Sequence, residues 1–176
     1  ERNTQQTKRR AFTNDECLKL IDAAKDSEET VLFDLILLGL YTGARIEELC
    51  QLRVEDVVVE DNCRAFRIAK SKTLAGTRLV PIHPSISDLA DKLVTTSRYN
   101  FLIFSKSKNQ YDERSTGLSR RFGRLKSSLG YGPELVFHSL RKTVTTKLEQ
   151  AGVPEGVAAD IVGHEKQTIT YGLYSG

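Results

Sequence analysis

The chain has 176 residues, of which 39% are hydrophobic and 28% are charged, and its formal net charge is +3. These values suit one soluble globular domain that buries a sizeable core. No segment approaches the ~18 consecutive apolar residues of a membrane span, and the polar N-terminus does not resemble a secretory signal. Three cysteines without paired spacing favour neither a zinc site nor a disulfide framework, so we expect a cytoplasmic protein with reduced thiols. The chain starts at Glu1 and contains no Met, which indicates part of a longer protein.

The distribution of charge is more informative than its sum. Residues 64–78 contain five basic residues and no acid, and residues 105–126 contain seven basic residues against two acids. Acids gather instead in the first predicted helix. Such segregation indicates a surface that faces a polyanion, although ordinary solvated faces remain an alternative.

The first part of the chain predicts three helices. Residues 1–10 are polar and basic without an apolar period, so we expect a linker or arm. A helix then begins in "FTNDECLKLIDAAK", where Thr13 and Glu16 have the spacing of a capping box. "EETVLFDLILLGLY" is apolar nearly all round and predicts a buried central helix, which Gly43 ends before a short helix in "RIEELCQL".

A strand region and a helical C-terminal half follow. Short strands are predicted in "DVVVED", "RAFRIAK" and "TRLVPIH", with turns at Asp61–Asn62 and near Ala75–Gly76. "HPSISDLADKLV" returns to helix and "NFLIF" predicts a short buried strand or core segment. Three more helices are expected in "RSTGLSRRFGRLKSSLG", "PELVFHSLRKTVTTKLEQAG" and "PEGVAADIVGH".

Several polar residues have chemistry suited to an anion. Arg45 stands at the start of a short helix, where free N–H groups and the helix dipole also favour phosphate. His138 and Arg141 are three residues apart, so a helix places them on the same side. Each has an ordinary alternative: Arg45 as a surface partner of Glu47 or Glu48, and the His-x-x-Arg spacing as chance.

Two further positions carry competing candidates. Lys70 and Lys72 lie where two predicted strands turn, and a lysine there suits a proton donor. Tyr171 and Tyr174 compete as a nucleophile, because a phenol with a free pKa of about 10 attacks phosphorus only with help from cations. His164 follows Gly163 at a helix end and, taken alone, is best explained as a structural histidine.

Four strings, "TGARIEEL", "AKSKTLAGTRLVPIH", "HSLRKT" and "VGHEKQTITYGLY", occur in an order that resembles the catalytic domain of the tyrosine recombinase (phage integrase) family. The resemblance covers residues 11–176 and implies an α+β, mainly helical fold with a small three-stranded antiparallel sheet. It implies six catalytic residues: Arg45, Lys72, His138, Arg141, His164 and Tyr174. Independently of the resemblance, the basic strand turn and the basic helix predict DNA contacts by Lys70, Arg78, Arg120, Arg121 and Arg124.

The resemblance also implies a role for each catalytic residue. Arg45 and Arg141 would clamp the phosphate, with Glu48 supporting Arg45, and His138 would act as a general base. In the ending "YGLYS" the second tyrosine, Tyr174, would be the nucleophile. Lys72, placed shortly before "RLVP", would protonate the leaving oxygen, and His164 would donate to the phosphate.

The function implied is site-specific cleavage and rejoining of DNA through a 3′-phosphotyrosine, to integrate or excise mobile DNA, without metal, cofactor or ATP. The expected partner is double-stranded DNA, on which the full-length protein would be a tetramer with accessory DNA-bending proteins and no membrane contact. We expect a bacterial or phage-encoded protein associated with the nucleoid. A small core-binding domain, absent from this chain, would attach through residues 1–10, and the chain alone would be monomeric. A type IB topoisomerase-like enzyme and a non-catalytic DNA-binding regulator are the alternatives.

Overall fold

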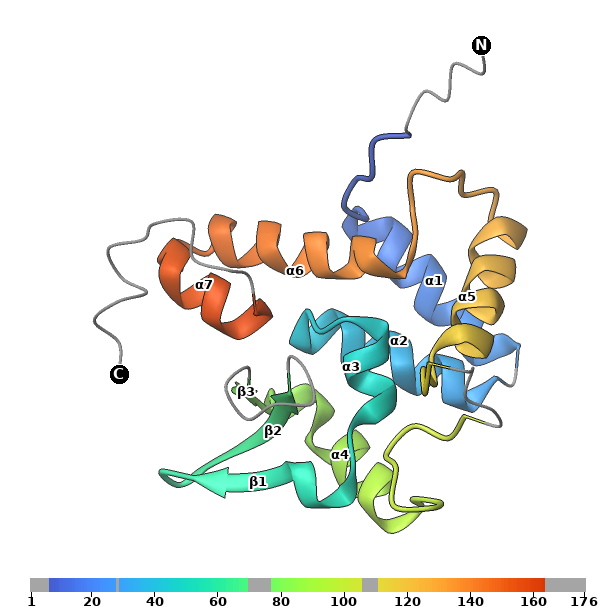
Figure 1. Ribbon diagram of the computed structural model, residues 1–176. Coiled ribbons are helices and arrows are strands. Elements are labelled where there is room, and N and C mark those ends of the chain that lie inside the picture. Colours follow the sequence, from blue (N-terminus) through green and yellow to red (C-terminus); the bar gives the residue numbers. More distant parts are fainter. Residues whose placement is uncertain (1–6, 28, 70–76, 106–110, 164–176) are drawn as a thin grey trace.

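The computed structural model describes residues 7–27, 29–69, 77–105 and 111–163. Helices in this part of the chain surround a central helix, and a small sheet lies to one side (Figure 1). The helices are α1 (Asn14–Asp26), α2 (Thr30–Thr42), α3 (Ile46–Gln51), α4 (Ser87–Thr95), α5 (Thr116–Ser128), α6 (Phe137–Gln150) and α7 (Glu155–Val162). The strands are β1 (Val57–Glu60), β2 (Cys63–Ala69) and β3 (Thr77–Pro81). The predicted mainly helical fold with a three-stranded antiparallel sheet is confirmed.

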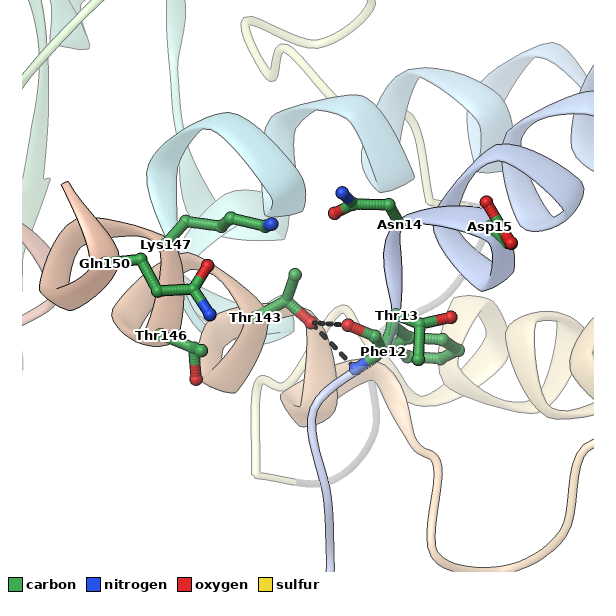
Figure 2. Close-up of a pocket in the computed structure, with 8 residues that line it drawn as sticks. All are labelled: Phe12, Thr13, Asn14, Asp15, Thr143, Thr146, Lys147 and Gln150. Atoms are coloured by element: carbon green, nitrogen blue, oxygen red, sulfur yellow. Dashed lines mark hydrogen bonds between the residues drawn. The ribbon is translucent and has the colours of Figure 1, made fainter.

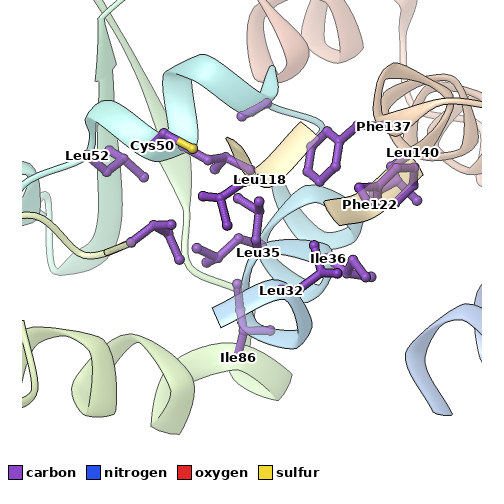
Figure 3. Packing of buried hydrophobic residues seen from close by; sticks show 14 of the residues in the cluster. Leu32, Leu35, Ile36, Cys50, Leu52, Ile86, Leu118, Phe122, Phe137 and Leu140 are labelled. Atoms are coloured by element: carbon purple, nitrogen blue, oxygen red, sulfur yellow. The ribbon is translucent and has the colours of Figure 1, made fainter. Parts of the chain in front are cut away.

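Helix α2 is the buried centre that its nearly uniform apolar sequence predicts. It contacts α1, α3, α5 and α6, and in Figure 3 its Leu35 and Ile36 lie among side chains from α3, α5 and α6. The crossing with α6 is close at Gly39, where a Cβ would lie 2.9 Å from the ring of Phe137 and 3.1 Å from a methyl of Leu140. A larger residue at this position would push α6 away from α2.

The sheet has the order β1-β2-β3, and both pairs are antiparallel. Phe66 in the central strand pairs with Val57 on one side and Val80 on the other, and it is fully buried. The predicted turn at Asp61–Asn62 is confirmed, because both residues have positive φ angles, 49° and 61°. This conformation matches a two-residue turn whose twist suits a hairpin.

Local signals in the sequence place several other elements correctly. The Thr13–Glu16 capping box is present at the start of α1. The "NFLIF" segment contributes Leu102 and Ile103 to the core, while Phe101 makes only isolated bridges, so it is a core segment and no regular strand. No helix among the described residues is long and apolar enough to cross a membrane.

The chain before α1 is held on the domain from residue 9 onward. Arg10 donates its backbone N–H to the carbonyl of Glu134 at 3.2 Å, and its guanidinium makes two 2.7 Å hydrogen bonds to the carboxylate of Glu16. Lys142 donates to the carbonyl of Arg9 at 2.9 Å. The last residues of the predicted linker therefore pack against α1 and α6, and the domain boundary itself stays a prediction.

Candidate catalytic site

The candidate site lies where the ends of α2 and α7, the start of α3, strand β3 and helix α6 meet. Gly43 ends α2 in a left-handed conformation with φ of 63°, and the chain reverses so that Arg45 caps the N-terminus of α3. A Cβ on Gly43 would lie 2.8 Å from a methyl of Val162 at the end of α7. The glycine thus supplies both the reversal and the room for α7 to approach.

A buried carboxylate organises this cluster. Only 7% of the Glu48 side chain is exposed. Its Oε2 accepts the backbone N–H of Arg45 at 2.8 Å and Nη2 of Arg78 at 2.8 Å, while its Oε1 accepts Nη1 of Arg45 at 2.9 Å and Nη1 of Arg78 at 3.2 Å. Burial by itself would raise the pKa of Glu48, but the hydrogen bonds from Arg78 and Arg45 lower it below its ordinary value of 4.5. Glu48 is therefore ionised at neutral pH and holds both arginines.

Arg141 is the largest fully buried side chain of the described residues, with 1% of its surface exposed. Its Nη1 donates to the carbonyl of Gly43 at 2.9 Å and also to the carbonyl of Val162. Burial, followed by the nearby charge of Arg45, lowers the pKa of Arg141 from 12.5 to about 10. The guanidinium therefore remains protonated at neutral pH and joins the ends of α2 and α7.

The four groups together carry two net positive charges. Arg45, Arg78 and Arg141 contribute three guanidiniums, and Glu48 contributes one carboxylate. Like charges held together in a partly buried region repel one another unless an anion approaches. The structure thus confirms that Arg45 pairs with Glu48, and it places this pair in an electropositive cluster.

His138 lies one helical turn before Arg141, and its side chain is exposed. Both residues line one cavity of about 340 Å³, as the three-residue spacing predicts. The other lining residues come from the chain before α1 and from the same face of α6: Arg9, Arg10, Ala11, Lys142, Thr145 and Thr146. Our sequence analysis missed the contribution of Arg9 and Lys142; their signals are the basic string "KRR" and the residue next to Arg141.

A second cavity of about 360 Å³ lies between the start of α1 and α6 (Figure 2). There the hydroxyl of Thr143 accepts the backbone N–H of Phe12 at 2.8 Å and donates to its carbonyl at 3.3 Å. The remaining lining residues are Thr13, Asn14, Asp15, Thr146, Lys147 and Gln150. None of the predicted catalytic residues that the structure describes lines this cavity, which marks the place where the incoming chain is fastened to α6.

Arg78 is placed differently from an exposed DNA contact. Its place in a basic string predicted a DNA contact together with the other basic residues of the strand turn, but only 11% of its side chain is exposed. Its guanidinium binds Glu48, and its Nε donates to the carbonyl of Ile161 at 3.0 Å. The sequence shows a basic residue in a basic string and cannot show that a buried carboxylate from α3 faces it.

The arginines of α5 lie elsewhere. Arg120 and Arg124 are exposed, whereas Arg121 is half-buried and forms an ion pair with Glu29. Glu29 precedes the first residue of α2, and Gly43 follows the last. The 13 residues of α2, at a rise of 1.5 Å each, separate these two ends by about 20 Å. A DNA contact by α5 would therefore fall at some distance from the arginine cluster.

The remaining predicted residues, Lys70, Lys72, His164 and Tyr174, lie outside the described residues, as does the competing Tyr171. The described chain ends at Gly163, which follows α7 in a left-handed conformation with φ of 73°. His164 is the next residue in the sequence. The roles expected of these residues stay predictions.

Known proteins share this sequence pattern. The pattern of the phage integrase family matches residues 10–175. Tyrosine recombinase XerA of Pyrococcus horikoshii is 28% identical over 168 residues, which cover 92% of this chain and 55% of the relative. Prophage integrase IntF of Escherichia coli is 30% identical over 136 residues, which cover 74% of this chain and 27% of the relative.

The fold is shared as well. The crystal structure of a lambda integrase tetramer bound to a Holliday junction matches with a TM-score of 0.69 and 25% sequence identity, and the match covers 92% of this chain and 48% of that one. The chain thus spans about half the length of XerA and of lambda integrase, and less of IntF. Because the family pattern extends over nearly the whole sequence and the fold agrees with it, the chain belongs to the phage integrase family.

Proposed function

We propose that residues 11–176 are the catalytic domain of a site-specific DNA recombinase that integrates or excises mobile DNA. The reaction is the exchange of one phosphodiester bond for another through a 3′-phosphotyrosine. It needs no ATP, metal or cofactor, since the energy of the broken bond is kept in the covalent intermediate. The relatives named above are recombinases and integrases, which supports this assignment.

The observation that carries the proposal is the electropositive cluster. Arg45 and Arg141 come from segments nearly a hundred residues apart. Arg45 binds the buried carboxylate of Glu48, and Arg141 lies near that carboxylate and donates to the end of α7. Two guanidiniums in fixed positions suit a phosphoryl group that gains negative charge during attack. An interaction of this kind contributes about 3 kcal/mol to a transition state.

Each step of the proposed reaction is assigned to a particular residue. The oxygen of Tyr174 attacks phosphorus while His138 accepts the phenolic proton, and Arg45 and Arg141 hold the non-bridging oxygens. The bond from phosphorus to the 5′-oxygen breaks, and Lys72 gives that oxygen a proton. The 5′-hydroxyl of the partner strand then attacks the phosphotyrosine and releases the tyrosine. His164 would donate a further hydrogen bond to the phosphate.

The partner is double-stranded DNA. Lambda integrase forms a tetramer on a Holliday junction, and by analogy the full-length protein would assemble as a tetramer on DNA, with accessory DNA-bending proteins, in the nucleoid of a bacterium. The exposed Arg120 and Arg124 on α5 would add backbone contacts away from the cluster. The chain alone would be a monomer.

The test is covalent trapping. The protein is incubated with a pool of nicked duplexes of randomised sequence, and adducts that survive denaturant are isolated, sequenced and mapped by peptide mass spectrometry. We expect wild-type adducts at Tyr174, none from Tyr174→Phe, and adducts from Tyr171→Phe. Absence of any wild-type adduct would contradict the proposal and favour a non-catalytic DNA-binding regulator. Relaxation of supercoiled plasmid without strand exchange would instead indicate a type IB topoisomerase.

A further inference from the structure

We propose that Arg78 is a positioning residue for recombination: it holds Glu48 and the C-terminal end of α7 in one arrangement, and so fixes Arg45 relative to the end of α7. The inference rests on the proposed function and assigns Arg78 a task different from contact with DNA. It concerns residues from β3, α3 and α7, which meet at this one guanidinium.

The hydrogen bonds that Arg78 makes to described residues point into the protein. Its two Nη atoms each donate to one oxygen of Glu48, at 2.8 and 3.2 Å, and its Nε donates to the carbonyl of Ile161 at 3.0 Å. Arg78 pairs with the carboxylate that it shares with Arg45, and little of its surface meets solvent. Arg45 shares the same carboxylate, so any movement of Arg78 changes the hydrogen bonds of Arg45.

The end of α7 is shaped around this guanidinium. A Cβ on Gly163 would lie 2.7 Å from Cζ of Arg78, so a side chain at this position would force the guanidinium or the end of α7 to shift. Arg78 donates a hydrogen bond to the carbonyl of Ile161, and Arg141 donates one to the carbonyl of Val162, the next residue in the chain. Two cations therefore cap the last turn of α7, where the carbonyls lack partners within the helix and the helix dipole is negative.

A lysine cannot replace Arg78 in this position. The planar guanidinium presents its donors as a rigid fork, which reaches both oxygens of Glu48 and a carbonyl on the opposite side. An ammonium keeps the charge but not this geometry. A role in positioning thus predicts that Arg78→Lys forms adducts slowly. A role that needs only positive charge predicts that Arg78→Lys forms them at the wild-type rate.

The first experiment compares Arg78→Lys and Arg78→Met with wild type, and uses Arg67→Met as the control. Arg67 lies on the adjacent strand β2 and forms an exposed ion pair with Glu60. Arg67→Met therefore also removes an ion-paired arginine from the sheet, but leaves the electropositive cluster intact. Single-turnover adduct formation is measured at saturating concentrations of a nicked duplex recovered from the randomised pool. We expect both Arg78 variants to be slower by about a hundredfold, as for a small misplacement of a catalytic group, with DNA affinity unchanged and the control near wild type.

The pH dependence separates positioning from general instability. Among the described residues, the charged groups that face Glu48 are Arg45 at the N-cap of α3, Arg78 on β3 and Arg141 on α6. Without the hydrogen bonds from Arg78, burial raises the pKa of Glu48. Adduct formation by Arg78→Met is then expected to fall further than that of wild type at mildly acidic pH, because both proteins depend on His138 as the base and only the variant also loses the ionised Glu48.

A second measurement needs no DNA. Amide hydrogen exchange in the peptide covering α7 and Gly163 is expected to be faster in Arg78→Met than in Arg67→Met, because the last turn of α7 has lost a cap. Equal exchange together with wild-type adduct rates would overturn the positioning role. Weaker DNA affinity with an unchanged saturated rate would also overturn it, in favour of direct DNA contact. Failure of wild type to form adducts would contradict the proposed function, while the exchange result would still decide whether Arg78 organises α7.

Discussion

Replacement of Glu48 by glutamine tests the centre of the arginine cluster. Each carboxylate oxygen accepts two hydrogen bonds, one from Arg45 and one from Arg78. Whichever way the new amide is turned, its NH₂ group cannot accept, so two of the four donors lose their partner. Hydrogen bonds to charged groups contribute about 1.5–3 kcal/mol each, and the smaller desolvation cost of the neutral amide offsets part of the loss. We therefore expect Glu48→Gln to lower the free energy of unfolding by about 3 kcal/mol.

Thermal and urea unfolding followed by circular dichroism measure this change. For a domain of this size, 3 kcal/mol corresponds to a melting temperature lower by roughly 6–12 °C. Glu60→Gln is the matched control, because Glu60 also pairs with an arginine, at 3.1 Å, but 46% of its side chain is exposed. An exposed pair contributes about 1 kcal/mol or less.

The pH dependence gives a sharper check. The pKa of Glu48 in the folded protein is lowered below its ordinary value of 4.5, so the ionised carboxylate stabilises the fold above that pH. This stabilisation is lost as the pH falls through the lowered pKa. The difference between wild type and Glu48→Gln should therefore shrink below pH 4.5. A difference that is constant down to pH 3, or no larger than that of Glu60→Gln, would refute the reasoning.

Three further predictions concern the chemistry and DNA affinity. Arg141→Lys should slow single-turnover adduct formation by about a hundredfold, because an ammonium does not reproduce the fork; a near-normal rate would exclude Arg141 from the clamp. Lys72→Ala should be inactive on normal DNA but recover cleavage of a 5′-bridging phosphorothiolate, because its thiolate leaving group needs little protonation. If this substrate rescued Lys70→Ala and not Lys72→Ala, Lys70 would be the proton donor instead. Charge reversal at the exposed Arg120 and Arg124 should reduce the salt dependence of DNA binding by about 0.9 for each phosphate that the protein no longer neutralises. An unchanged slope in fluorescence anisotropy would place α5 away from DNA.

The sequence by itself determined the elements whose causes are local. The capping box at Thr13, the two left-handed turn residues at Asp61–Asn62 and the nearly uniform apolar run of α2 each depend on neighbours a few residues away. The same holds for the order of the family's motifs, which identifies the chain without any knowledge of contacts. His138 and Arg141 share a cavity because helical periodicity alone brings them to one side.

Residue types and spacing left the partners of the charged residues undecided. Arg78 and Arg121 both stand in basic strings, yet one is buried against Glu48 and the other binds Glu29 at the far end of α2. Arg45 stands near two acids in the sequence, and only the fold shows that it shares Glu48 with Arg78. Those differences come from packing between distant segments. The close crossing of α6 over Gly39 and the approach of α7 to Gly43 bring five separate elements to one place. Only that tertiary arrangement makes Glu48 the shared acceptor of two arginines, because a buried carboxylate is stable only where folding supplies its donors.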